Sequence, residues 1–244
     1  MSESAQGDFA RPETLVNAFE GATQVLIVSS NASAYGGDVL AQHRSAVKAA
    51  RDAGTTRIVY TSHMAASTTS AFPPMLDHAA TEAMLEQSGV AWTSLRNGFY
   101  ASSGIAFMGD GLKIGSIEAP ADGKVSWTAH ADLAEAAAVV LAEEGRWNGP
   151  TPPLTGAQAL DPADLGQIAS DLLGKHVDRK VLTDDAMRAK LSARGLPDTI
   201  ITISLGFYAA SRASEFATVD PTLRQLLGRP PVAMRDLIAA RIGG

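Results

Sequence analysis

The feature that most constrains the fold is a regular alternation of short apolar runs and helical segments in the first 100 residues. Residues 25–28 are a continuous, largely β-branched run, residues 57–61 form a second run, and residues 90–95 alternate apolar with small polar side chains. Such runs are typical of strands covered by helices. Helical segments over residues 38–52 and 74–88 separate the runs. This alternation predicts an α/β fold with a right-handed parallel sheet.

Residues 74–100 have the most informative pattern within this alternation. Pro74 fits the first turn of a helix and Gly89 fits the left-handed residue just beyond its end. His78 and Glu82 are four residues apart, so they share one face of that helix. Ligands of open parallel sheets bind beyond the carboxyl ends of the strands. There the third run is followed by Asn97, Gly98, Phe99 and Tyr100.

Composition excludes several classes of protein. The chain has 244 residues, 45% of them hydrophobic and 19% charged, which is typical of an ordinary globular protein. A net charge of −6 without a long Lys/Arg run argues against nucleic acid and anionic membranes as partners. The chain has no cysteine, which excludes disulfides and thiolate ligands, and its histidines and carboxylates form no metal-binding pattern. With neither a signal peptide nor an apolar membrane span, we expect a cytoplasmic protein.

The second half of the chain differs in composition and in predicted secondary structure. Residues 102–125 are rich in glycine and predicted to be irregular, and an alanine-rich helix follows over residues 131–143. Beyond residue 147 most segments are helical. We therefore predict a first unit over residues 1–146 and a smaller, mostly helical cap over residues 147–244.

Several phrases carry a family resemblance, namely VLIVSS, QHRSAVKAARDAG, IVYTS, DHAATEAMLEQSGVAWTSLRNGFY and LLGRPPVAMRDLIA. From about Gln6 to its end the chain resembles the NmrA-like atypical short-chain dehydrogenases, in particular the NAD(P)H:quinone oxidoreductase branch. The resemblance implies a Rossmann-like first unit, NADP(H) or NAD(H) as cofactor, and hydride transfer to quinones or related small electron acceptors. The alternative is a non-catalytic NAD(P)-binding redox sensor or regulator, which the same family also contains.

The chain departs from the family pattern at its beginning. Family members start with a strand and a glycine-rich turn that brings backbone amides to the cofactor's pyrophosphate, and no such strand-turn-helix unit precedes Gln6. We therefore expect residues 1–146 to form an incomplete, N-terminally truncated Rossmann-like domain. A third hypothesis follows, in which the sequence is an inactive fragment of a longer reading frame.

The resemblance assigns two candidate catalytic residues. His78 matches a family position that faces the nicotinamide and the substrate, where a histidine of ordinary pKa near ~6.5 would donate a proton to a quinone oxygen. The alternative is a partly exposed helix histidine bonded to Asp77 or Glu82. Asn97 matches the loop that borders the nicotinamide, where its amide would orient the carboxamide or a quinone carbonyl. The alternative there is a capping turn that opens the next helix.

The candidate cofactor-binding residues are small polar or aromatic side chains at strand ends. Asp8 and Phe9 match a family position beside the adenine. Small hydroxyls at strand ends permit close approach to a ribose or nicotinamide, although they are also common turn residues. The remaining candidates are Ser29, Ser30, Asn31, Thr61, Ser62, Asn97, Gly98, Phe99 and Tyr100.

Other histidines and tyrosines receive less weight. We expect His43 to pack within its helix, and His63 and His130 to lie in loops at strand or helix ends rather than in the lining of the site. None of the four tyrosines is followed by lysine four residues later, the pair that many short-chain dehydrogenases use; Tyr60, for example, is followed by Met64.

The run at residues 25–28 predicts self-association. The resemblance makes it the fourth strand of the family's sheet, so its outer edge would lack a partner. It carries neither charge nor proline, the usual protection of a sheet edge. We expect this edge to pair with a second copy in a homodimer, or to aggregate.

Overall fold

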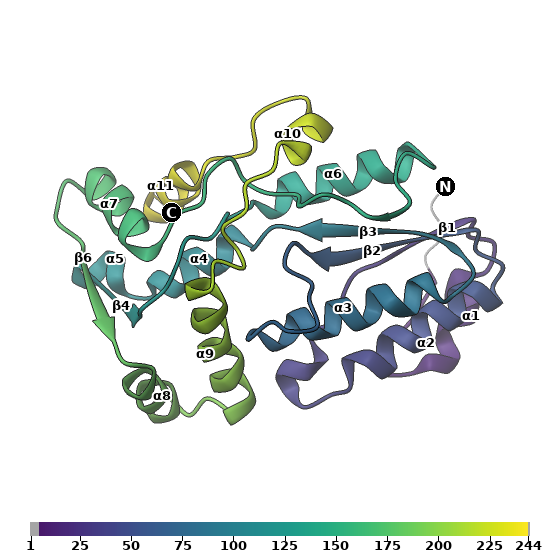
Figure 1. The fold of residues 1–244 in the computed structure, drawn as a ribbon, viewed down its shortest axis with the longest axis horizontal. Coiled ribbons are helices and arrows are strands. Elements are labelled where there is room, and N and C mark those ends of the chain that lie inside the picture. Colours follow the sequence, from purple (N-terminus) through teal and green to yellow (C-terminus); the bar gives the residue numbers. More distant parts are fainter. Residues whose placement is uncertain (1–4, 244) are drawn as a thin grey trace.

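The computed structural model describes residues 5–243, which form two lobes (Figure 1). The larger lobe is built on a parallel sheet with the strand order β1-β2-β3-β5. Its strands are β1 (Gln24–Ile27), β2 (Arg57–His63), β3 (Ala91–Asn97) and the short β5 (Gly149–Pro150). The register pairs Ile27 with Tyr60, and His63 with Asn97. The predicted α/β class with a parallel, Rossmann-like sheet is confirmed.

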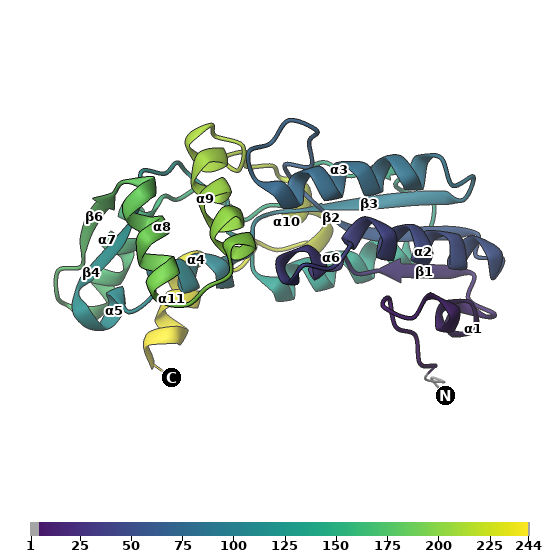
Figure 2. The same ribbon diagram turned by 90° about the horizontal axis from the view of Figure 1, so that it is seen from below.

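Helices cover both faces of this sheet (Figures 1 and 2). One face packs against α2 (Val39–Asp52) and α3 (Pro73–Glu86), flanked by a 3₁₀ turn (Pro12–Thr14) and α1 (Leu15–Phe19). The opposite face packs against α6 (His130–Ala142) and α10 (Thr222–Leu227). Asp38 caps α2 by accepting a hydrogen bond from the Ala41 amide, as predicted. Side chains of β2 alternate between the faces, so Tyr60 lies under α3 while Val59 faces α6.

The smaller lobe contains a second parallel pair of strands, β4 (Ser116–Pro120) and β6 (Asp178–Leu182). Around the pair lie six helices, α4 (Ala101–Met108), α5 (Gly111–Ile114), α7 (Pro162–Leu173), α8 (Asp184–Ala193), α9 (Asp198–Arg212) and α11 (Met234–Gly243). The prediction that residues 102–125 are irregular is therefore wrong. Gly104 lies inside α4. A Cβ at this position would be 3.0 Å from the Trp127 ring, so the close contact favours a residue without a side chain. This glycine marks a tight helix contact rather than a loop.

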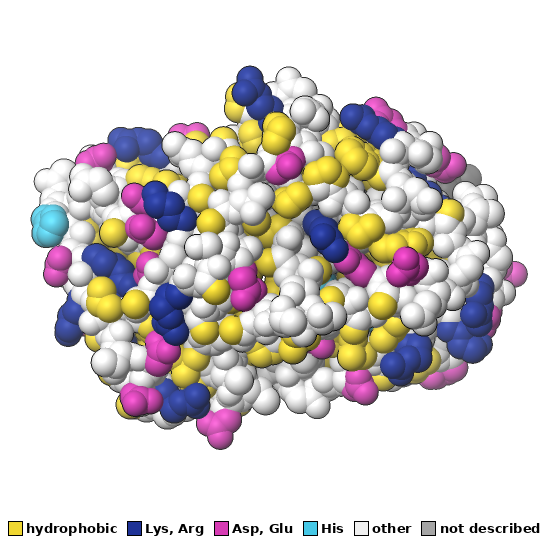
Figure 3. Space-filling model, viewed as in Figure 1, with side chains coloured by type: hydrophobic (Ala, Val, Ile, Leu, Met, Phe, Trp, Pro, Cys, Tyr) yellow, Lys and Arg dark blue, Asp and Glu magenta, His cyan; other side chains and the backbone are white. Residues whose placement is uncertain are grey.

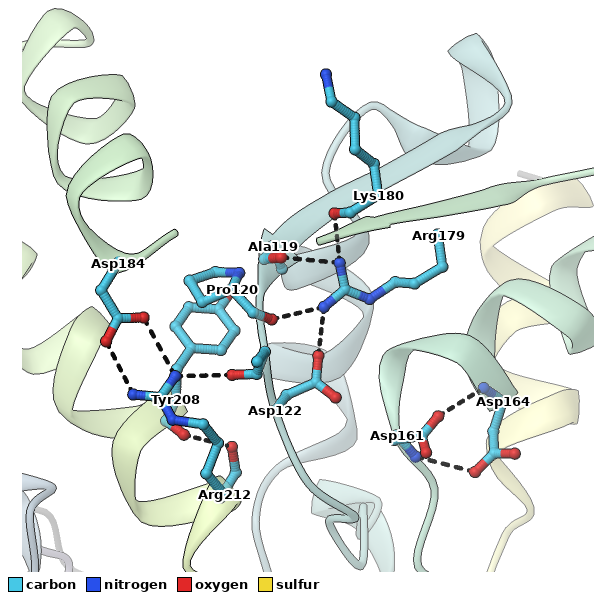
Figure 4. Close-up of polar contacts among 12 residues, drawn as sticks. Ala119, Pro120, Asp122, Asp161, Asp164, Arg179, Lys180, Asp184, Tyr208 and Arg212 are labelled. Atoms are coloured by element: carbon cyan, nitrogen blue, oxygen red, sulfur yellow. Dashed lines mark hydrogen bonds and ion pairs between the residues drawn. The ribbon is translucent and has the colours of Figure 1, made fainter. Parts of the chain in front are cut away.

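A polar network ties the smaller lobe together (Figure 4). The Arg179 guanidinium donates to the carbonyls of Ala119 and Pro120 at the end of β4, and it pairs with Asp122. Arg212 of α9 pairs with Asp184 at the start of α8. These contacts join β6 to the end of β4, and α9 to the start of α8.

Aromatic side chains join the two lobes. Phe99, which follows β3, packs against Phe207 of α9 at a ring-centroid distance of 4.9 Å and against Phe216 at 5.1 Å. The chain crosses between the lobes more than once, since β4 precedes residue 147 and β5 and α10 follow it. The division at residues 146/147 therefore stays a prediction.

Three further properties of the structure are the distribution of surface charge, the hydropathy of the helices and the grouping of possible metal ligands. On the face shown in Figure 3, acidic and basic side chains are interspersed rather than gathered by sign. None of the helices within residues 5–243 is long and apolar enough to cross a membrane. In the same residues no group of three or more His, Asp or Glu side chains is arranged to hold a metal ion.

Candidate functional site

A cavity of about 630 Å³ lies beyond the carboxyl ends of β1, β2 and β3. Residues of α3 and the start of α6 line it from the larger lobe, and Ile203 of α9 lines it from the smaller lobe. This is the position at which open parallel sheets bind ligands, and the volume is within the range of small-molecule sites. The predicted site residues in its lining are Ser29, Ser30, Asn31, Ser62, His78, Phe99 and Tyr100.

A second hollow continues from the cavity along the amino end of the chain. It has a volume of about 430 Å³ and is lined by Asp8 and Phe9, two further predicted residues. Ser30 and Asn31 line both spaces. The two spaces therefore adjoin at Ser30 and Asn31, with Phe9 in the second hollow and His78 in the main cavity.

Three predicted residues do not line either space. The Thr61 hydroxyl accepts a hydrogen bond of 2.8 Å from the Ser29 amide, so it shapes the end of β1. Gly98 lies against Thr128 and Leu154, where a Cβ would be 2.2 Å from the Thr128 hydroxyl. The Asn97 side chain is only 5% exposed.

His78 is held by a residue that sequence reasoning did not connect with it. The Tyr60 hydroxyl lies 2.8 Å from His78 Nδ1. Burial raises the pKa of Tyr60, so the hydroxyl keeps its proton and can donate it to that nitrogen. With the bond in this direction, the neutral imidazole carries its own proton on Nε2, on the side of the ring away from Tyr60. His78 therefore bonds to Tyr60 rather than to Asp77 or Glu82.

The protonation state of His78 differs from the expectation. Burial, with a smaller contribution from the nearby His43, lowers the pKa of His78 to about 4. The predicted ordinary pKa is therefore wrong, because the ring lies against the core rather than in open solvent. At neutral pH His78 is an uncharged hydrogen-bond donor.

Glu82, which shares a helix face with His78, has a structural role. Its carboxylate accepts hydrogen bonds from the hydroxyls of Ser62 and Ser94 and pairs with Arg96 at 2.7 Å. This one side chain of α3 therefore joins the helix to both β2 and β3. The Ser62 hydroxyl is thereby bonded to Glu82, although Ser62 also lines the cavity.

His43 organises the end of β1. Its Nε2 accepts a hydrogen bond of 2.9 Å from the Ser30 amide, so that nitrogen carries no proton. The Thr81 hydroxyl donates to the Asp77 carbonyl and therefore accepts from His43 Nδ1, at 2.9 Å. Burial lowers the pKa of His43 to about 4, in agreement with a neutral ring. His43 packs within its helix as predicted, and it also orients the strand end that borders the cavity.

Two further histidines that were given little weight line the cavity. His63 accepts a hydrogen bond from the Ala65 amide on Nδ1, and its buried Nε2 has no partner within the described part of the chain. Burial lowers the pKa of His63 well below its ordinary value. His130, at the start of α6, stacks on Tyr100 with ring centroids 4.1 Å apart. Their positions at strand and helix ends were the only signal in the sequence.

These residues fit a bound dinucleotide. The Asn97 Oδ1 is buried and, like His63 Nε2, lacks a hydrogen-bond partner in residues 5–243. Buried polar atoms without partners are costly and point to a ligand that supplies them. Small side chains at Ser29 and Ser30 leave room for a ribose beside the backbone.

The sequence is similar to known proteins over nearly its full length. Residues 2–144 match the sequence model of the family described as NAD(P)H-binding. Quinone oxidoreductase 2 of Escherichia coli is 32% identical over 96% of this chain and 80% of that protein. The NAD(P)H azoreductase of Xenophilus azovorans is 26% identical over 93% of this chain and 78% of that protein.

Solved structures agree with these sequence similarities. The NADPH complex of the Escherichia coli NADPH-dependent quinone oxidoreductase superposes with a TM-score of 0.89 at 30% identity, covering 97% of this chain and 82% of that one. The Citrobacter triphenylmethane reductase complexed with NADP(H) superposes with a TM-score of 0.85 at 30% identity, covering 97% and 82%. The regulator NmrA, at 18% identity and a TM-score of 0.72 over 96% and 78%, shares the fold.

Proposed function

The chain belongs to the NAD(P)H-binding family, in its NmrA-like and quinone oxidoreductase-like branch, and we propose that it is an NAD(P)H-dependent reductase of quinones or related small electron acceptors. The observation that carries the proposal is the cavity at the strand ends, with His78 fixed by Tyr60 on one side. Similarity to the NADPH-dependent quinone oxidoreductase over 97% of the chain supports it.

In this proposal NADP(H) or NAD(H) lies along the two connected hollows. Asp8 and Phe9 border the adenine end, Ser29 to Asn31 border the ribose, and Phe99 and Tyr100 border the nicotinamide. When bound, the cofactor supplies a hydride from its nicotinamide ring. The protein's contribution is to hold the acceptor against that ring and to exclude water.

His78 acts in the proposal as a neutral hydrogen-bond donor. Its Nε2–H polarises the acceptor's carbonyl oxygen, and a neutral imidazole is suited to this because it adds no charge to the site. Tyr60 keeps that proton on Nε2 by donating to Nδ1. The proton that a reduced quinone takes up then comes from solvent, not from a protonated His78.

Asn97 acts in the proposal mainly through Tyr100. A hydrogen bond with Asn97 lowers the pKa of Tyr100, although burial outweighs it and raises the pKa overall. Because Asn97 is buried and Tyr100 lines the cavity, the amide positions the tyrosine ring.

The test is oxidation of NADPH and of NADH by the purified protein, followed by absorbance, with a neutral naphthoquinone as acceptor. Stoichiometric formation of the hydroquinone is the expected result. Dinucleotide binding without oxidation, measured by cofactor fluorescence, would instead support the alternative of a redox sensor. Absence of binding would contradict both.

The homodimer remains part of the proposal. Within residues 5–243, β1 is the edge strand of its sheet, and its outer side pairs with no other strand. Light scattering coupled to size exclusion is the test. A monomer with fast amide exchange at residues 25–27 would contradict pairing through this edge.

A further inference from the structure

A short segment of the chain contacts both helices that begin at the main cavity. His130 is the first residue of α6, and Tyr100 is the N-cap residue of α4. Both side chains line the cavity, and their rings stack at a centroid distance of 4.1 Å. Residues 228–234, which we call the strap, lead from α10 into α11 and pass the start of α6 (Figure 1).

The sequence of the strap explains its shape. Gly228 ends α10 in the left-handed conformation, with φ of 65°, which glycine adopts without strain. Arg229 follows, and then come Pro230 and Pro231, which hold φ near ~−65° and have no amide proton. The next amide that can donate a hydrogen bond is that of Val232. The strap is therefore a stiff connection with one polar group on each side of the proline pair.

Both polar groups bind one buried carboxylate, that of Asp132 in the first turn of α6. The Val232 amide donates a hydrogen bond of 2.7 Å to Asp132 Oδ2. The Arg229 guanidinium lies 2.9 Å from Asp132 Oδ1 and also pairs with Glu135, one turn further along α6. Within residues 5–243 no hydrogen bond of good geometry reaches Asp132 Oδ1, so the charge of Arg229 is what compensates this oxygen. Because the Asp132 side chain is completely buried, its carboxylate would be costly without that partner.

The other end of the strap packs on α4. Met234 is 5% exposed, and its methyl carbon would lie 3.0 Å from a Cβ at Gly104. The absence of a side chain at Gly104 thus lets Met234 pack directly against the helix. The strap thereby joins the first turn of α6 to α4, the two helices that carry the stacked rings of His130 and Tyr100.

Neither helix fixes its own beginning with a side chain. The N-cap residues, Ala129 of α6 and Tyr100 of α4, make no capping hydrogen bond through their side chains. Asp132 is the third residue of α6, where an acidic side chain can bond back to the cap, but its carboxylate faces the strap instead. A hydrogen bond of 2.9 Å from the Ala101 amide to the Thr128 carbonyl joins the backbone in front of the two helices.

We propose that Arg229, acting through Asp132, positions the ring pair of His130 and Tyr100 in the wall of the cavity. This inference rests on the proposed reductase function, in which Tyr100 borders the nicotinamide. Arg229 does not line the cavity, so it is a positioning residue. Without its charge, the first turn of α6 shifts to expose the Asp132 carboxylate to water. His130 belongs to that turn, so its ring moves away from Tyr100.

The test measures the stack and the turnover separately. Proton NMR of the His130 ring reports the stack through the ring current of Tyr100, and His130→Ala assigns the signals. In Arg229→Met we expect these signals to move towards those of an unstacked histidine. We expect kcat for NADPH oxidation with 2-methyl-1,4-naphthoquinone to fall about tenfold, less than the ~10²-fold cost of a 1 Å misplacement, because the backbone also holds the helix starts. The dissociation constant of NADPH should change less than about twofold, as for an interaction that affects mainly the transition state.

Arg235→Met is the matched control. It removes another arginine of the C-terminal segment, one that lies 3.5 Å from Asp171 and is about half exposed. Its kcat and the His130 signals should equal those of the parent. Arg229→Lys keeps the charge but lacks the planar fork that spans two carboxylates, so its kcat should lie between those of the parent and Arg229→Met.

A neutral variant and a double variant complete the test. If Arg229→Met does not fold, Arg229→Gln replaces it, since glutamine can donate a hydrogen bond without supplying charge. His130→Ala should itself lower kcat, because Tyr100 loses its stacking partner. The kcat of Arg229→Met combined with His130→Ala should stay within about twofold of that of His130→Ala alone, because the two residues act on one structure.

The outcomes separate this inference from the proposed function. Losses that multiply in the double variant would show that Arg229 acts elsewhere, and the inference is then overturned. Unchanged His130 signals in the neutral variant of Arg229 overturn it as well. If the wild-type protein neither binds nor oxidises NADPH, the reductase function fails, and the NMR measurement alone decides whether Arg229 positions the ring pair.

Discussion

The Tyr60 hydroxyl lies 2.8 Å from Nδ1 of His78, so a side chain from the middle of the sheet holds the ring of a cavity histidine by a hydrogen bond. Tyr60 is completely buried, and His78 lies at the surface of the cavity. The pair gives α3 a fixed orientation on β2. Burial, rather than this pair, keeps His78 uncharged at neutral pH.

Removal of the Tyr60 hydroxyl should therefore affect turnover more than cofactor binding. In Tyr60→Phe the proton of His78 is free to move between its ring nitrogens, and we expect kcat with a neutral quinone to fall about tenfold. This is less than the ~10²- to 10⁴-fold contribution of a positioned general acid or base, because Tyr60 acts only through His78. The dissociation constant of NADPH, measured by fluorescence, should change less than about twofold. Tyr208→Phe, which removes a buried hydroxyl from the smaller lobe, is the control.

The proposed roles of His78 and Asn97 give a second expectation. His78→Ala and Asn97→Ala should each lower quinone reduction at saturating cofactor more than they weaken NADPH binding, because His78 lines the nicotinamide side of the proposed site and Asn97 positions Tyr100 there. His176→Ala, at an exposed position of the smaller lobe, is the matched control. Activities equal to the wild-type value in both variants would remove the two residues from the mechanism.

The Glu82–Arg96 pair should make a large contribution to stability. Arg96→Met leaves the Glu82 carboxylate, 9% exposed, with only the two serine hydroxyls as partners. We expect the free energy of unfolding to fall by about 3 kcal/mol, the lower end for breaking a buried pair, since Arg96 is partly exposed. Urea denaturation is the measurement. Arg51→Met, which removes an exposed pair with Asp52, should cost less than ~1 kcal/mol; equal losses in the two variants would contradict the prediction.

Gly98 should be irreplaceable for a steric reason. A Cβ at this position would lie 2.2 Å from the Thr128 hydroxyl and 2.9 Å from the Leu154 carbonyl oxygen. Gly98→Ala should therefore lower the free energy of unfolding by ~1 to 3 kcal/mol through overpacking. Gly166→Ala within α7 meets nothing closer than 3.4 Å, so its stability should stay the same or rise slightly. A thermal midpoint of Gly98→Ala equal to that of the parent would contradict this account.

Local patterns in the sequence predicted the elements but not the contacts between distant residues. The boundaries of α3 followed from Pro74 and Gly89, and the cavity position followed from the strand ends, because both depend on neighbouring residues. The pairing of Tyr60 with His78 depends on the register between β2 and α3, which no local pattern encodes. The missed helix α4 has the same cause, since Gly104 is explained only by Trp127 packed against it.

The last prediction concerns acid stability and depends on His43. Its pKa is about 4 in the folded protein, because burial disfavours the charged ring, and about 6.5 in the unfolded chain. Between these values the unfolded state binds more protons than the folded state, so the free energy of unfolding decreases as pH falls from about 6.5 towards 4. His43 alone should account for roughly 3 kcal/mol over this window, at about 1.4 kcal/mol for each pH unit.

His43→Gln keeps an acceptor for the Ser30 amide and removes the titration, so its urea midpoint should depend less on pH between about 6.5 and 5, where carboxylates contribute little. His176→Gln, at an exposed position, should retain the parent's pH dependence. Equal slopes for His43→Gln and the parent would show that His43 is not neutral in the folded protein, and the hydrogen bond that orients the end of β1 would then need another explanation.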